Sequence, residues 1–128
     1  MRTFETFEPG TVLGVHAFAL TKSAASEWTA LFPDDAECLP SMPPAMVAMV
    51  IMQAFVTVLH DRPQGNIHAG QKVSIARLPA VNDQLVTTLR CAGKALKSGR
   101  RWVSFTSDTN DAAGSLLFRG EMTTIWAQ

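Results

Sequence analysis

Two acidic residues and one histidine stand at positions of this sequence where they could move a proton. Asp34 and Asp35 follow a Phe-Pro helix stop, between two predicted helices, where a carboxylate could act as a general base. In such a turn, acidic residues often do no more than contact solvent. His68 begins a predicted strand, where it could act near a subunit interface or simply bond the backbone at a strand edge.

The stretch from Ala45 to Leu59 is strongly apolar, and Gln53 is its only strongly polar side chain. An amide there could orient a reacting water molecule, or it could be a buried amide whose hydrogen bonds are all satisfied. Backbone N–H groups at the start of this stretch could hold an oxyanion. Because Pro43 and Pro44 have no N–H, that role falls to Ala45, Met46 and the residues after them.

Composition excludes several classes of protein. The chain has 128 residues, of which 47% are hydrophobic and 17% charged, so it can bury a core within one domain. Eleven basic residues balance eleven acidic ones, which argues against a protein held on nucleic acid or an anionic membrane by bulk charge. Cys38 and Cys91 are too few for a disulfide framework or a structural zinc site. We expect no metal and a cytoplasmic location.

No targeting or membrane segment is predicted. Residues 1–5 include an early acid and no apolar run follows them, so they do not resemble a secretory signal. The apolar stretch from Ala45 to Leu59 is shorter than the roughly 20 residues that cross a bilayer.

The first half of the chain predicts a strand and two helices. Residues 11–20 are compatible with a strand, and Thr21 or Ser23 can cap a short helix that ends near Phe32. Ser41 followed by two prolines predicts the start of a second helix, which runs from about Ala45 to His60. This helix is apolar on every side, so we expect it to be enclosed, with His60 complementing the dipole at its end.

The second half predicts four long strands joined by short turns, as an antiparallel meander over residues 66–126. A strongly curved antiparallel sheet that wraps around the helix would bury the apolar surface of both. Gly70, Gly93 and Gly120 stand where bulges could ease that curvature. The predicted fold is therefore α+β, a single hotdog domain that spans residues 1–128.

One run of the sequence resembles a known family. Residues 67–85 contain His68, Gln71, an apolar strand, Arg77 and then Pro79, Val81 and Asp83, in the order found in the MaoC-like hydratase/dehydratase group of hotdog proteins. Leu78 is inserted between arginine and proline, and Asn82 stands where glycine is usual. Met42-Pro43-Pro44 resembles the N-terminal, often non-catalytic, halves and subunits of the group. The resemblance extends over about residues 9–127.

This resemblance implies a ligand and a partner. Members of the group act on acyl groups carried by coenzyme A (CoA) or acyl carrier protein, usually as dimers with the site at the subunit interface. We therefore expect an acyl thioester ligand, no cofactor, and a homodimer or a heterodimer with a second hotdog subunit. Lys94, Lys97, Arg100 and Arg101 flank a predicted turn and could meet the phosphates of CoA or an acidic carrier protein, or could only solubilise a hairpin tip.

Two versions of the activity follow from one departure. The family's catalytic loop has an aspartate and, five residues later, a histidine, whereas Leu39 and Pro40 follow Asp34 and Asp35 at that spacing. In a catalytic (3R)-hydroxyacyl hydratase/dehydratase, Asp35 or His68 would move the proton while Gln53 orients water. In a non-catalytic subunit, a partner would supply the Asp–His pair, and the missing histidine favours this version. A hotdog thioesterase that uses Gln53 and Asp34 is the alternative.

The residues expected to contact the substrate lie at three places. The methionines of the second helix could line an acyl channel, because thioethers adapt to irregular apolar ligands, or could simply pack in the core. The expected contacts are at the start of that helix, near the bulge of the next strand and on the basic hairpin: Ala45, Met46, Met49, Gly70, Arg100 and Arg101.

Overall fold

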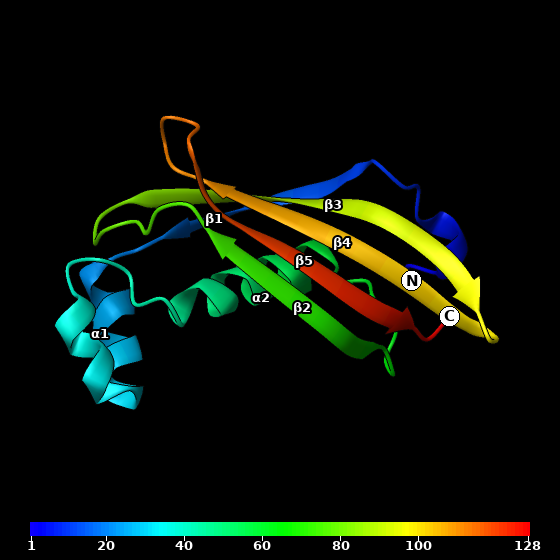
Figure 1. The fold of residues 1–128 in the computed structure, drawn as a ribbon, viewed down its shortest axis with the longest axis horizontal. Coiled ribbons are helices and arrows are strands. Elements are labelled where there is room, and N and C mark those ends of the chain that lie inside the picture. Colours follow the sequence, from blue (N-terminus) through cyan, green and yellow to red (C-terminus); the bar gives the residue numbers. More distant parts are fainter.

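Five antiparallel strands form one curved sheet in the computed structural model, which describes residues 1–128 (Figure 1). The spatial order of the strands is β1-β3-β4-β5-β2. Only β3, β4 and β5 form a meander. The prediction that all four long strands are consecutive neighbours is wrong for β2, which pairs with β5 and not with β3. Eight residues connect β2 to β3, so the chain crosses from the β2 edge of the sheet to a position beside β1, the strand at the opposite edge. The strands are β1 (Val12–Ala19), β2 (Ile67–Ile75), β3 (Gln84–Lys97), β4 (Arg100–Asn110) and β5 (Leu116–Trp126).

The helices are α1 (Lys22–Leu31) and α2 (Met46–Val58), with 3-10 turns η1 (Phe4–Thr6) and η2 (Pro33–Cys38). None of them has the length and apolar character needed to span a bilayer. The predicted cap of the first helix is confirmed, because the Thr21 hydroxyl accepts a hydrogen bond from the Ala24 N–H at 3.0 Å.

Ser41 does not cap α2, which corrects the predicted helix start. No side chain caps this helix; instead the Met46 and Val47 N–H groups donate to the carbonyl oxygens of Pro43 and Pro44, at 2.9 and 3.2 Å. Ser41 forms a β-bridge with Ala80 instead. The two prolines supply acceptors for the first turn of the helix, so no hydroxyl cap is needed there.

Helix α2 lies along the concave face of the sheet, mainly against β1 and β3 (Figure 1). Its inner side is buried, with Val50 and Ala54 fully inaccessible. Gly14 on β1 allows the close approach, because a Cβ atom there would lie 2.9 Å from Val58 Cγ1. The outer side of the helix is open, and Gln53 is exposed. The prediction that the helix is enclosed is therefore wrong for this face of the single chain, and of the two interpretations of Gln53 the buried amide is excluded.

The predicted glycine bulges are confirmed at two of three positions. The strand register shifts between His68 and Gly70 and between Cys91 and Gly93. Gly120 lies in regular register and is not a bulge. A Cβ atom at Gly120 would lie 2.7 Å from the Ser107 hydroxyl oxygen, so the sheet and α2 need the absence of a side chain here.

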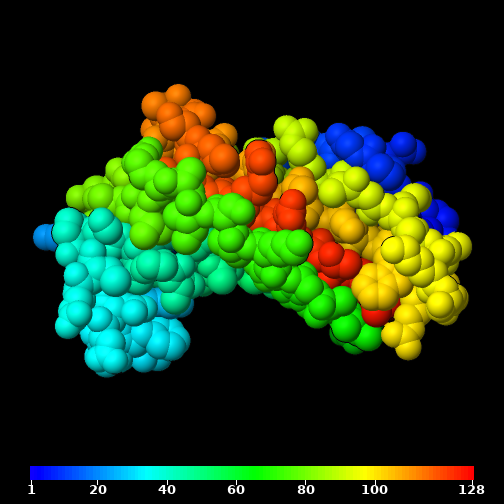
Figure 2. Space-filling model, in the orientation of Figure 1, coloured from blue at the N-terminus to red at the C-terminus, as the bar shows by residue number.

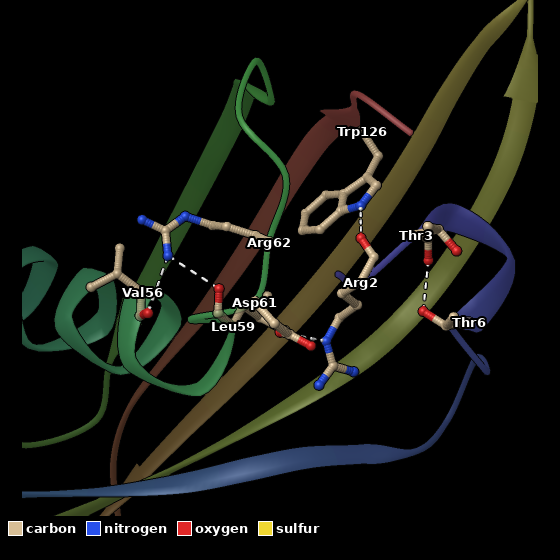
Figure 3. A network of polar contacts seen from close by, with 8 residues as sticks. All are labelled: Arg2, Thr3, Thr6, Val56, Leu59, Asp61, Arg62 and Trp126. Carbon is tan, nitrogen blue, oxygen red and sulfur yellow. Dashed lines mark hydrogen bonds and ion pairs between the residues drawn. The ribbon is translucent and has the colours of Figure 1, made fainter.

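The N-terminal segment closes one end of the core (Figure 3). Phe7 packs edge-on against Phe105 and Trp126, with ring centroids 5.5 and 4.9 Å apart. The Trp126 indole N–H donates to the Arg2 carbonyl oxygen at 2.9 Å. The Phe4 N–H donates to the Gln128 carbonyl oxygen at 2.6 Å, so the two chain ends are held together.

Arg62, rather than His60, satisfies the end of α2. Its guanidinium donates to the carbonyl oxygens of Val56 and Leu59, both at 3.1 Å (Figure 3). His60 is exposed. The predicted role of a cation at this helix end therefore belongs to Arg62, whose longer side chain folds back over the last turn.

Asp61 should make the stability of the protein depend on pH in acid. Partial burial raises the pKa of this carboxyl, but the hydrogen bond and charge of Arg2, a backbone hydrogen bond and the charge of His60 together lower it by more, so it lies below its ordinary 3.8. The contribution is therefore complete above about pH 4 and disappears as the pH falls through the lowered pKa. Because the pair is partly exposed, we expect Asp61→Asn to cost about 0.5 kcal/mol at neutral pH and nothing near pH 2. Urea unfolding at the two pH values tests this, and an equal difference at both would contradict it.

Candidate functional site

An open groove of about 330 Å³ lies between α1 and α2. Helix α1 and the η2 turn project beyond one end of the sheet, as the cyan lobe in Figure 2 shows. The contributing positions on each helix are three or four residues apart, so each helix offers one face to the groove. The lining residues are Phe18 of β1, Ala24, Glu27, Trp28 and Leu31 of α1, and Met49 and Gln53 of α2.

The wall formed by α1 is apolar and held in place. The Trp28 indole N–H donates to an Asp35 carboxylate oxygen at 2.7 Å, and the Phe32 ring packs on Trp28 with centroids 4.7 Å apart. Leu31 is 75% exposed and Phe32 is 49% exposed. Together they form an exposed apolar patch on the lobe, beside the groove, which makes the lobe a candidate binding surface.

Two polar side chains interrupt the apolar lining, one on each helix. Gln53 is the predicted candidate, and the structure places it in the groove together with Met49. Glu27 is its counterpart on α1 and is the only ionisable residue of the lining. Glu27 was not predicted as a site residue, although its spacing of three residues from Ala24 and four from Leu31 places it on the apolar face of the predicted helix.

Asp35 is half-buried but is not part of the groove lining. Its carboxylate accepts the Trp28 indole N–H, so in this structure it orients the tryptophan that forms the wall. Asp34 is exposed, and no hydrogen bond to its side chain is present.

The start of α2 contributes less than the sequence predicts. Met46 is fully buried in the core, and its N–H is already bonded to the Pro43 carbonyl oxygen. It therefore presents neither a side chain nor a free N–H to a ligand. Ala45 is exposed just before the helix, outside the groove lining.

His68, Gly70, Arg100 and Arg101 lie away from the groove. His68 and Gly70 are exposed on β2, at the edge of the sheet. The hairpin that carries the two arginines is at the end of the molecule opposite α1 (Figure 1), and Arg101 donates to the Ala127 carbonyl oxygen at 3.4 Å. Within one chain, these four residues do not join Gln53.

The buried thiol of Cys91 belongs to the core. Burial raises the pKa of this cysteine, so the thiol stays protonated at neutral pH and is a poor nucleophile. Cys38 and Cys91 are both free.

Strand β2 is an open edge, with eight of its nine residues exposed. Val73 and Ile75 pair in register with Gly120 and Phe118, which are buried, so they point to the concave side beside α2. In the middle of the strand, the Gln71 side-chain nitrogen is buried and has no hydrogen-bond partner. The edge therefore combines free backbone groups with exposed apolar side chains, while the unsatisfied amide is buried behind it.

Solved structures with the same architecture identify the fold. A MaoC-like dehydratase from Rhodospirillum rubrum superimposes with a TM-score of 0.82 at 17% identity, covering 100% of this chain and 99% of that one. The chain has the hotdog fold. An (R)-hydratase from A. caviae gives a TM-score of 0.74 at 17% identity, with 94% of this chain and 97% of that chain covered.

A third hotdog structure is that of a (3R)-hydroxyacyl-ACP dehydratase complex from Mycobacterium tuberculosis. It gives a TM-score of 0.67 at 12% identity, with 88% of this chain and 94% of that chain covered. Neither a family model nor a curated protein matches the sequence. At these identities the hotdog likeness confirms the predicted curved sheet around one long helix.

Proposed function

We propose that this hotdog protein binds acyl thioesters and works in the hydration of 2-enoyl groups or the dehydration of 3-hydroxyacyl groups. The observation that carries the proposal is the groove between α1 and α2, whose apolar walls suit an acyl chain and whose two polar side chains can meet its functional end. The names of the hydratase and dehydratases that share the fold support this reaction class.

The proposal does not rest on an Asp–His pair. Leu39 and Pro40 occupy the spacing at which the resembled family has its histidine, and the Asp35 carboxylate is bonded to Trp28. The proton must therefore be moved by a partner subunit or by another residue of the groove.

A second copy of the chain is the partner that the open β2 edge supports. Pairing β2 with itself in antiparallel fashion satisfies the free backbone groups and covers Val73 and Ile75. The two-fold axis would pass near the middle of the strand, where Gln71 has its unsatisfied amide. A hotdog subunit of different sequence would use the same edge.

The two-fold arrangement also gives the distant candidates a role. It reverses the partner, so the partner's basic hairpin and the beginning of its β2 approach the end of the molecule that carries α1. Arg100 and Arg101 would then be available to CoA phosphates or an acidic carrier protein, and His68 would lie at the interface. This arrangement and a cytoplasmic location are parts of the proposal.

Filling the groove should weaken acyl-CoA binding. We expect Ala24→Trp to place an indole where the acyl chain lies and to weaken binding of a short 3-hydroxyacyl-CoA at least about tenfold in calorimetric titration, a loss of about 1.4 kcal/mol. Ala30→Trp is the matched control, because Ala30 is exposed on the same helix but is not part of the lining.

Unchanged binding in Ala24→Trp, or equal losses in the two variants, would contradict the assignment of the groove. Release of free thiol from an acyl-CoA by the wild-type protein would show that it is a thioesterase and not a hydratase.

A further inference from the structure

We propose that Glu27 is the catalytic residue that moves the proton in this groove. The inference rests on the proposed function and specifies how that function is carried out without an Asp–His pair. It assigns the chemistry to a residue on α1, outside the loop where the family resemblance places it.

The composition of the groove lining supports Glu27 as the residue that moves the proton. Within this chain, Glu27 is the only residue of the groove lining whose side chain can act as a general base. Asp35 lies outside the lining with its carboxylate bonded to the Trp28 indole. His68 lies on the β2 edge, outside the lining.

The surroundings of Glu27 suit a general base. Glu27 is exposed and shares the groove lining with Trp28, Leu31 and Met49, and no ion pair engages its carboxylate. A carboxylate that is not held in an ion pair is free to accept a proton from a water molecule in the groove.

Gln53 faces the same groove from α2 and completes the arrangement. Its amide N–H groups can donate to the thioester carbonyl oxygen, where negative charge accumulates as water adds to the conjugated double bond. The two helices thus place a proton acceptor and a hydrogen-bond donor on opposite walls.

The reaction balances with water as the only co-reactant. The Glu27 carboxylate takes a proton from water as the water oxygen bonds to C3 of the 2-enoyl group. The π electrons of the C2–C3 double bond move toward the carbonyl oxygen, which Gln53 stabilises as an enolate. Glu27 then returns the proton to C2, so the net change is the addition of one water molecule, and the carboxylate is regenerated. Dehydration runs through the same steps in reverse.

Glu27→Gln tests the proposal, because it keeps the shape of the side chain and removes its basicity. Turnover of a short trans-2-enoyl-CoA is followed by loss of the conjugated double bond, and binding of the same thioester is measured by calorimetry. We expect turnover to fall about 100-fold or more while the dissociation constant changes less than about threefold.

Two carboxylate controls separate this role from a general effect of charge. Glu37→Gln changes an exposed acid on η2, and Asp35→Asn changes the partner of Trp28. Glu37→Gln should retain wild-type turnover. Asp35→Asn acts through the position of Trp28, which lines the groove, so any loss of turnover should be accompanied by weaker binding of the thioester.

Wild-type turnover in Glu27→Gln would overturn the role of Glu27. Binding of the enoyl-CoA by the wild-type dimer without any turnover would also overturn that role, but it would leave the proposed acyl binding in place. Absence of binding overturns the proposed function together with the inference.

Discussion

Val73→Asp should convert a dimer of this protein into a monomer of 13.9 kDa. Val73 is 40% exposed on the concave side of β2, where the proposed two-fold pairing would cover it. Burying an unpaired carboxylate against its own copy costs several kcal/mol, which is enough to break a dimer at micromolar concentration. Light scattering coupled to size exclusion gives the mass directly.

Val15→Asp is the matched control for this experiment. Val15 is 63% exposed on β1, which forms the opposite edge of the sheet. This variant should keep the mass of the dimer. A monomeric wild-type protein would contradict the proposed β2 interface, as would a Val15→Asp variant that dissociates while Val73→Asp does not.

Phe105→Ala should cause the largest loss of stability of any single truncation considered, about 3–5 kcal/mol. Phe105 is 1% exposed and lies between the rings of Phe7, Phe55 and Trp126, at centroid distances of 5.5, 5.3 and 5.9 Å. Truncation removes the central ring of this cluster, and the sheet and helix around it cannot collapse into the cavity. Chemical denaturation followed by circular dichroism gives the free energy of unfolding.

Phe32→Ala removes the same atoms from a ring that is 49% exposed on the α1 side of the molecule. We expect this control to cost about 0.5 kcal/mol, in line with substitutions at the surface. Equal losses for the two variants would show that the aromatic cluster does not carry the stability of the core.

The sequence predicted the elements better than their arrangement. Period-two alternation identified β3, β4 and β5, and two prolines followed by an apolar run identified α2. The position of β2 was missed because alternation reports which face of a strand is buried and not which strand lies beside it. The eight-residue connection to β3 was the available sign that β2 is not its neighbour.

The candidate site was only partly predictable for a related reason. Gln53 and Met49 were identified, because a polar or flexible residue stands out in an apolar helix. Glu27 was missed, because an acid on a short amphipathic helix normally faces solvent, and its position depends on the lobe that α1 forms beyond the sheet. Met46 was assigned to the ligand, but helical phase turns its side chain into the core.

The indole N–H resonances of the three tryptophans test the central claim, that the groove between α1 and α2 binds the acyl group of a thioester. Trp28 lines the groove. The Trp126 indole N–H is bonded to the Arg2 carbonyl oxygen in the core, and Trp102 lies on β4, outside the groove lining. We predict that titration of a ¹⁵N-labelled sample with a short 3-hydroxyacyl-CoA moves the Trp28 resonance and leaves that of Trp126 in place, whereas CoA without an acyl group does not move Trp28. A Trp28 resonance that stays fixed at saturating ligand would contradict the account.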